Sequence, residues 1–240
     1  MKKKLVLLAV ICICISAKAQ LIAEMELLIP HYYPGEVYFK DGHHEEYVEV
    51  ELPRVGKSKL SVKKYDSDKK RTTIEAEDII CIKIWHKDFP DKVHVLYYVH
   101  AKKYLLNNEH QWGTPIMGNS WGVVYQCEMN YKMNNKTGEL GFVKFVGGKS
   151  PDTPTLYYLM RPVWQEAQLV MWDEILVPKK KAAEIFAENE EISQAILDGK
   201  LSGEDMEYIL DEMAGGQKEK SLDTKPASES EQNGEIGDDE

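Results

Sequence analysis

The chain has 240 residues and an acidic balance, with 30 Lys and Arg against 40 Asp and Glu and a net charge of −10. This excess of negative charge disfavours nucleic acid, whose binding depends on neutralising phosphates, and it equally disfavours docking on acidic lipid. The length suffices for one sizeable domain or two small ones.

The first residues, Met1–Ala19, have the pattern of a secretory signal peptide. Three lysines precede an apolar segment, Leu5–Ile15, and Ala17 and Ala19 are the small residues of a cleavage site. The apolar segment is shorter than the roughly 20 residues that a transmembrane helix needs. We predict export through the Sec pathway and cleavage after Ala19, to a periplasmic or extracellular chain without a membrane span. Its net charge would be −14, because the leader carries four lysines.

Two of the four cysteines belong to this leader. Cys12 and Cys14 follow isoleucine, whereas a lipid-modified cysteine normally follows a small residue, so the leader does not favour a lipoprotein. Export permits a disulfide between Cys81 and Cys127. Both lie in apolar segments where a free cysteine acts as a small buried hydrophobe, and their pairing stays open.

Residues 20–106 are predicted to form an N-terminal β block. Alternating segments flank Asp41 and Gly42, a tight-turn signal, and predict a hairpin. A second hairpin is expected within Lys59–Glu75. The more continuously apolar Ile79–Trp85 fits a central strand.

Residues 107–177 are predicted to form a second β block. We expect it to open with a loop at Asn107–Asn119, because Gly113 and Pro115 interrupt regular structure there. Further strands are expected on either side of a hairpin loop at Asn134–Gly138.

The spacing of apolar residues changes at Pro178 from two residues to about three and a half, which predicts a helical cap over residues 178–214. Residues 215–240 are polar and lack aromatic side chains, which is typical of a disordered acidic tail. The predicted fold is therefore α+β and mostly β. It has two successive antiparallel sheet blocks, barrel-like or sandwich-like, and a C-terminal helical cap.

Two polar clusters of the first block carry possible chemistry. His43, His44, Glu45 and Glu46 are ordinary ligands for a divalent metal. Neighbouring strand residues point to opposite faces, so we favour a solvated turn and predict neither a metal site nor a cofactor. The lysine-rich segment 57–71 has the charge to grip an anionic glycan or an acidic partner. It equally suits a charged edge hairpin that opposes aggregation, which we favour.

Four aromatic residues are the candidate binding residues: Trp112, Trp121, Tyr158 and Trp164. Exposed on a sheet face, such rings stack on sugars or pack against a partner protein. Buried, they supply core, because aromatic side chains bury large areas and suit pleated surfaces. The partner would be an envelope protein or a glycan, and burial is the alternative.

No familiar catalytic motif is present, and no catalytic residue is predicted. The serine within Gly118–Gly122 lacks the spacing of a nucleophile elbow, and the sequence has no phosphate loop or dinucleotide fingerprint. The alternative function is a carboxylate-dependent hydrolase of envelope or dietary polymers. It requires two of Glu45, Glu46, Glu128 and Glu166, or one of them and a histidine, to meet in one cleft.

Several segments resemble a group of uncharacterised exported proteins of Bacteroidetes-type bacteria. They are the lysine-led leader ending in Ala-Gln, Gly35–Gly42, Ile74–Ile80, Leu156–Arg161 and Ile196–Lys200. The resemblance covers most of residues 35–214 and implies a mostly β exported domain with a helical C-terminal cap. It assigns no activity and no functional residues. We predict an exported, non-enzymatic envelope protein that binds a partner protein or a glycan.

Overall fold

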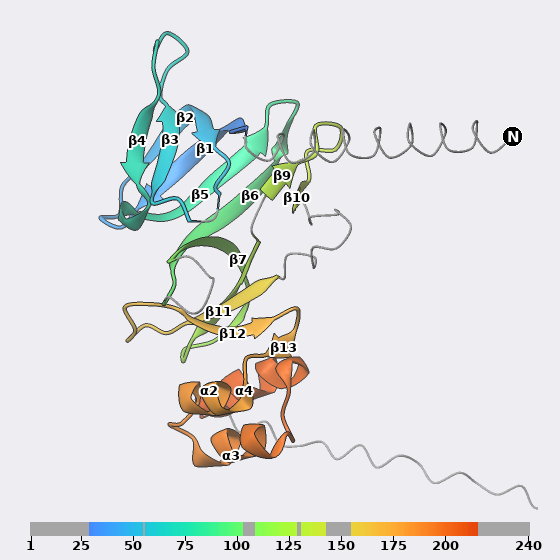
Figure 1. The fold of residues 1–240 in the computed structure, drawn as a ribbon. Helices are drawn as coiled ribbons and strands as arrows, with labels where there is room; N and C mark the ends of the chain where they lie inside the picture. The colour runs from blue at the N-terminus through green and yellow to red at the C-terminus, as the bar shows by residue number, and fades with distance from the viewer. Residues whose placement is uncertain (1–28, 55, 103–108, 129–130, 143–154, 216–240) are drawn as a thin grey trace, which may run out of the picture.

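The computed structural model describes residues 29–54, 56–102, 109–128, 131–142 and 155–215 (Figure 1). The predicted signal peptide and the predicted acidic tail beyond Gly215 lie outside the described residues. Within the described ranges, no helix is long and apolar enough to cross a bilayer.

The strands are, in chain order, β1 (Tyr32–Phe39), β2 (His44–Glu51), β3 (Lys59–Lys63), β4 (Thr72–Glu75), β5 (Ile79–His86), β6 (Phe89–His100), β7 (His110–Gly118), β8 (Val123–Cys127), β9 (Tyr131–Met133), β10 (Leu140–Phe142), β11 (Leu156–Met160), β12 (Gln168–Trp172) and β13 (Ile175–Leu176). The helices and 3₁₀ turns are η1 (Ala76–Asp78), α2 (Lys179–Ile185), α3 (Glu190–Asp198), η2 (Gly203–Asp205) and α4 (Met206–Met213).

Most strands join one large antiparallel sheet, in the order β13-β12-β11-β8-β7-β6-β5-β1-β2-β3-β4. The helices follow at its C-terminal end (Figure 1). The predicted mostly β class with a C-terminal helical cap is confirmed. The two blocks are halves of a single sheet, and the described strands form no closed barrel, because β13 and β4 are free edges.

Two hydrophobic cores lie along this sheet. The first core is formed by the following buried residues: Val37, Tyr47, Val50, Leu52, Leu60, Val62, Ala76, Ile79, Ile82, Ile84, Leu96, Trp112 and Met133. The second core lies between the β8, β11 and β12 strands and the helices, whose Phe186, Ile196 and Ile209 are fully buried. Each such side chain contributes roughly 1.5–3 kcal/mol relative to exposure.

The β6–β7 ladder joins the two cores. Residues 97–100 of β6 pair with residues 110–113 of β7 in antiparallel register. Val99 is buried in the second core, whereas Trp112 is buried in the first core and Tyr98 packs against it. Alternate residues of one ladder therefore serve different cores.

The predicted loop at Asn107–Asn119 was wrong, because β7 occupies most of it. Gly113 is needed for close packing: a Cβ atom there would lie 2.5 Å from Sγ of Cys127. Pro115 stands beside a register shift between Pro115 and Met117, and such irregularities tolerate proline within a sheet. Both residues are therefore compatible with a strand in this setting.

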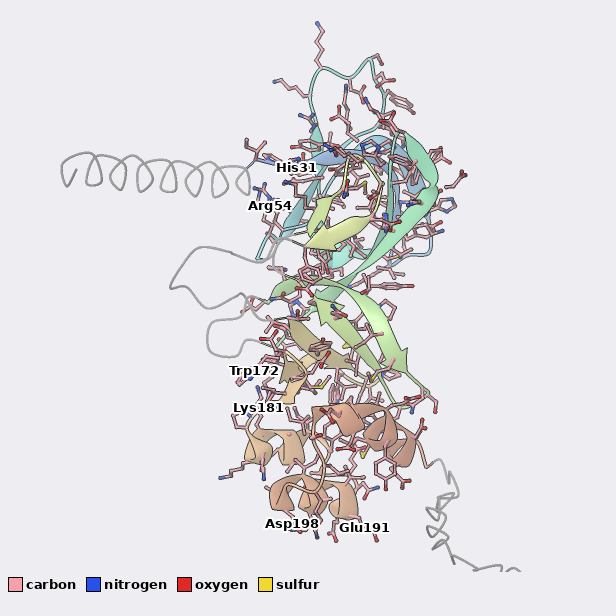
Figure 2. The ribbon with its side chains drawn as sticks, turned by 90° about the vertical axis from the view of Figure 1, so that its right-hand side faces the viewer. His31, Arg54, Trp172, Lys181, Glu191 and Asp198 are labelled. Atoms are coloured by element: carbon pink, nitrogen blue, oxygen red, sulfur yellow. The ribbon has the colours of Figure 1, made fainter. Side chains whose placement is uncertain are left out.

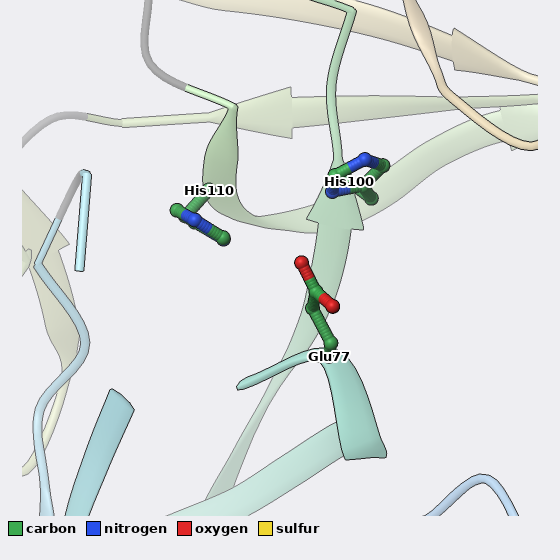
Figure 3. Close-up of side chains that lie close together, drawn as sticks. All are labelled: Glu77, His100 and His110. Atoms are coloured by element: carbon green, nitrogen blue, oxygen red, sulfur yellow. The ribbon is translucent and has the colours of Figure 1, made fainter. Parts of the chain in front are cut away.

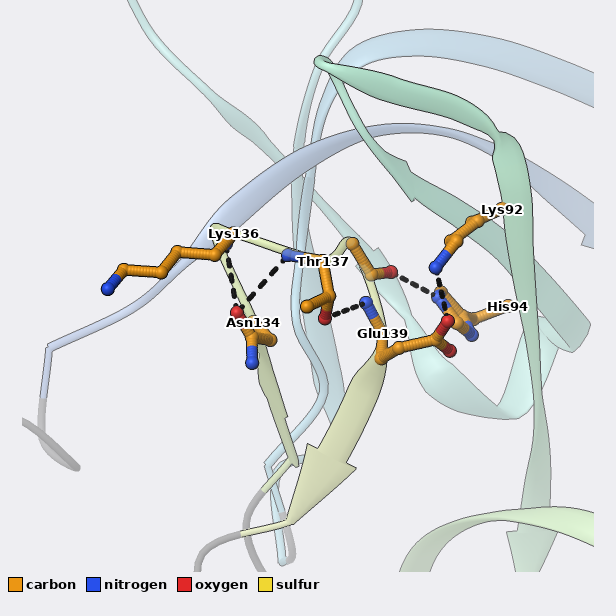
Figure 4. A network of polar contacts seen from close by, with 7 residues as sticks. Lys92, His94, Asn134, Lys136, Thr137 and Glu139 are labelled. Atoms are coloured by element: carbon orange, nitrogen blue, oxygen red, sulfur yellow. Dashed lines mark hydrogen bonds and ion pairs between the residues drawn. The ribbon is translucent and has the colours of Figure 1, made fainter.

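The predicted hairpin loop at residues 134–138 is confirmed as the turn between β9 and β10 (Figure 4). Oδ1 of Asn134 accepts hydrogen bonds from the turn backbone, and Gly138 has a positive φ of 71°. The turn docks on β6, because Nε2 of His94 lies 2.7 Å from the Gly138 carbonyl and Lys92 pairs with Glu139.

The lysine-rich segment 57–71 contains β3 and the turn that leads into the edge strand β4, so it belongs to an edge hairpin, as predicted. Nζ of Lys59 lies 2.7 Å from Glu75, and Nζ of Lys64 lies 3.0 Å from Glu45. These charges are therefore partly matched across neighbouring strands.

Cys81 and Cys127 are both free and buried. Burial raises the pKa of each thiol, which keeps both groups in the unreactive thiol form. The open question of pairing is answered: the two residues act as buried hydrophobes.

Replacing Gly113 by alanine tests the close packing of β7 on β8. Gly113→Ala should lower the free energy of unfolding by about 1–3 kcal/mol, because the added methyl overpacks the contact with Cys127. Gly141→Ala is the control, since the nearest atom to its Cβ position is 3.8 Å away, and should stay within about 0.5 kcal/mol. Urea denaturation measures both, and equal stabilities would contradict the packing.

Candidate binding cleft

The four aromatic candidates do not share one surface. Trp112 is 3% exposed in the first core, and Tyr158 is fully buried in the second. Trp121 is 9% exposed at the margin of the second core, whereas Trp164 is partly exposed. Burial, the alternative interpretation, holds for three of the four, and Trp164 borders a cleft.

The turn between β7 and β8 holds Trp121 in place. Oδ1 of Asn119 accepts a hydrogen bond from the Trp121 backbone (2.9 Å), and its Nδ2 donates to the carbonyl of Leu210 in α4 (2.8 Å). A Cβ atom on Gly122 would lie 2.9 Å from Cδ1 of Leu159 and 3.2 Å from the Met160 carbonyl oxygen, so a larger residue there would force its neighbours to shift. The glycine-flanked serine segment thus fixes a tryptophan against the helices.

Arg161 lies between the two tryptophans. Its guanidinium carbon is 4.2 Å from the ring centre of Trp121 and 5.2 Å from that of Trp164. Nη1 of Arg161 donates to Glu188 (2.7 Å), and the Trp121 indole donates to the same carboxylate (3.4 Å). These two hydrogen bonds lower the pKa of Glu188, so the group is held as a carboxylate.

A cleft of about 440 Å³ opens beside this cluster. It lies between the end of β6, the β11–β12 connection and α2. Its lining residues are Lys102, Arg161, Trp164, Gln168, Lys181, Glu184, Ile185, Ala187 and Glu188. The volume falls within the range of small-molecule sites.

Two lysines give one side of the cleft a positive potential. Lys181 lies at the junction of α2 with the sheet (Figure 2). Burial and the nearby charge of Lys102 lower the pKa of Lys181, which places the two ammonium groups within electrostatic reach of one another. Glu184 acts in the opposite direction on Lys181. An anionic ligand would relieve the repulsion between the lysines.

The cleft combines a partly exposed indole, an amide, three cationic side chains and the carboxylates of Glu184 and Glu188. An indole face binds the apolar face of a sugar ring, whereas Gln168 offers both a donor and an acceptor. The lysines suit a carboxylate or sulfate group. None of Lys102, Gln168 or Lys181 was a candidate from the sequence, since they come from three distant segments without a shared motif.

The polar residues considered for catalysis or metal binding are dispersed. Glu45 accepts a hydrogen bond from Tyr47 and pairs with Lys64 on the β2–β3 surface, whereas Glu128 is buried and bonded by Thr155. Glu166 does lie beside a histidine, 3.6 Å from Nε2 of His100, but neither residue lines the cleft.

The His43–Glu46 cluster stays in and beside the β1–β2 turn. His43 pairs with Asp41 and stacks on Phe39, and His44 stacks on Tyr38. The two imidazoles thus have different partners, as the solvated-turn interpretation requires.

Comparisons with protein-family models, curated proteins and solved structures give no match for this chain.

Changing Arg161 to lysine tests the stacked cluster beside the cleft. Arg161→Lys should destabilise the protein by about 1–2 kcal/mol, because the 11% exposed planar group loses its fit between two indoles and Glu188. Arg71→Lys is a matched control, since Arg71 also stacks on a ring, Tyr32, and pairs with Glu49, but is 41% exposed.

The control should lose no more than about 0.5 kcal/mol. Thermal denaturation compares the two variants. A larger loss in Arg71→Lys than in Arg161→Lys would contradict the assignment.

Proposed function

We propose that this chain is an exported, non-enzymatic envelope protein that binds an acidic glycan segment in the cleft. The observation that carries the proposal is the convergence of Trp164 with Lys102 and Lys181 around one cavity. The leader pattern of Met1–Ala19 supports export.

A glycan suits the cleft better than an apolar ligand does. The lining offers one indole, Trp164, and most of the other side chains are polar or charged. Sugar rings match this composition, because each presents an apolar face for stacking and hydroxyl groups for hydrogen bonds. The two lysines select sugars that carry a carboxylate or sulfate, whose charge they neutralise.

Glu188 favours binding over hydrolysis. Glycoside hydrolysis uses a carboxylic acid whose pKa is raised so that it can protonate the leaving group. The pKa of Glu188 is lowered by its bonds to Arg161 and Trp121, so this cleft carboxylate is poorly suited as the acid. It serves instead to orient Arg161.

Calorimetric titration with a galacturonic-acid oligosaccharide tests the proposal. The acidic oligosaccharide should bind, and the uncharged galactose oligosaccharide should bind more weakly. Trp164→Ala should weaken binding about tenfold, corresponding to about 1.4 kcal/mol of lost stacking. Lys181→Ala should weaken it about fivefold, and Lys180→Ala, on the same helix but outside the cleft lining, should leave it unchanged.

Equal affinity for the acidic and the uncharged oligosaccharide would contradict the charge selection. No binding of either, or equal binding by the Lys181→Ala and Lys180→Ala variants, would overturn the site. Release of shorter oligosaccharides during incubation would contradict the non-enzymatic assignment and support the hydrolase alternative instead.

A further inference from the structure

A second cluster of polar side chains lies near the cleft, because its His100 is two residues before the cleft residue Lys102. Glu77, His100 and His110 each direct one potential metal-ligating atom to a common region, and these atoms lie within 4.8 Å of one another. Figure 3 shows the Glu77 carboxylate directed toward the space between the two imidazole rings. Glu77 is exposed and both histidines are partly exposed, so a cation can reach the cluster from solvent.

The β6–β7 register brings the two histidines together. His100 is the direct partner of His110, and Tyr98 is the direct partner of Trp112. Directly opposed residues of an antiparallel pair share a face, as do residues two apart on one strand. All four rings therefore project from the same side of the ladder. Glu77 reaches them from η1, the 3₁₀ turn that precedes β5 and contacts β6.

Tyr98 holds one of the histidines in orientation. Its hydroxyl lies 2.7 Å from Nδ1 of His110, and its ring packs edge-on against Trp112 with centres 5.5 Å apart. A ring with one nitrogen held in this way presents the other nitrogen to a cation, and such outer contacts are a regular feature of metal sites.

Carboxylates surround the cluster on several elements. Besides Glu77, Glu166 lies 3.6 Å from Nε2 of His100. Glu77 and Glu109 also place negative charge near the Tyr98 hydroxyl. The negative charge attracts a cation, and the same carboxylates do not attract the acidic ligand proposed for the cleft.

We propose that Glu77, His100 and His110 bind a divalent cation of the zinc class. Two imidazoles and one carboxylate form a ligand set typical of Zn²⁺ and its neighbours, whereas Mg²⁺ and Ca²⁺ prefer oxygen ligands alone. Tetrahedral ligands at about 2.0–2.1 Å lie roughly 3.4 Å from one another. The 4.8 Å limit of the cluster therefore requires only small side-chain movements.

The site offers three protein ligands and leaves a fourth position to water or to a ligand. Open coordination of this kind distinguishes reactive or exchangeable zinc sites from closed structural ones. The inference does not depend on a glycan in the cleft. It differs from the sequence-based prediction of no metal site, which was argued from the cluster His43, His44, Glu45 and Glu46 in the turn.

Calorimetric titration of the tag-free chain with Zn²⁺ tests this site. We expect one ion per chain, and Co²⁺ should give visible absorption bands of a four-coordinate site. His100→Ala and His110→Ala should each lower the Zn²⁺ affinity at least tenfold. His43→Ala is the matched control, an exposed histidine beside Asp41, and should leave the affinity unchanged.

Two further variants separate ligation from folding. Glu77→Gln changes an exposed side chain and should preserve the circular dichroism spectrum while lowering the affinity at least tenfold. Tyr98→Phe keeps the ring on Trp112 and should lower the affinity about tenfold through loss of the outer hydrogen bond. Absence of one-to-one binding, or wild-type affinity in Glu77→Gln, would overturn the proposal even if the histidine variants fail to fold.

Discussion

The pairing of β6 with β7 is the physical constraint on which the rest of the structure depends. Beyond the ladder, the Ala101 amide donates to Glu109 and the Lys102 amide donates to Ala167. Residues 100–102 therefore run beside residues 166–168. This contact places His100 next to Glu166. Two residues later in each segment, Lys102 and Gln168 line the cleft.

Charge gives these neighbouring regions different ligand preferences. The chain as a whole is acidic, with a net charge of −10, and carboxylates surround the histidine cluster. The cleft departs from this background because three cationic residues, Lys102, Arg161 and Lys181, outnumber the two carboxylates Glu184 and Glu188 in its lining. An anion therefore gains most from the cleft, and a cation gains most from the histidines. Both attractions weaken as salt screens the exposed charges.

Local patterns predicted the parts of the fold that local physics determines. Alternation and the Asp41-Gly42 turn placed the first hairpin, and a continuous apolar stretch placed β5 near the middle of the sheet. The same rules failed at β7. Gly113 and Pro115 usually interrupt a strand, but here Gly113 allows close packing on β8 and Pro115 lies at a register shift.

The sites were harder to predict because they depend on register and on distant segments. His100 and His110 are ten positions apart, and only a strand at His110 makes them direct partners. Because the sequence analysis predicted a loop at Asn107–Asn119, it did not predict that pairing. Arg161 and Lys181 line the same cleft from the β11–β12 connection and from α2, and no sequence spacing encodes this proximity. Among the four aromatic candidates, Trp164 alone is partly exposed and lines the cleft.

Nuclear magnetic resonance most directly tests the claim that two separate ligand sites adjoin residues 100–102, by titrating the chain separately with Zn²⁺ and with an acidic oligosaccharide. Zn²⁺ should shift the imidazole signals of His100 and His110, and the oligosaccharide should shift the indole signal of Trp164. Their effects should overlap only in residues 100–102 and 166–168. Unchanged imidazole signals with Zn²⁺, or an unchanged Trp164 indole with the oligosaccharide, would contradict the account.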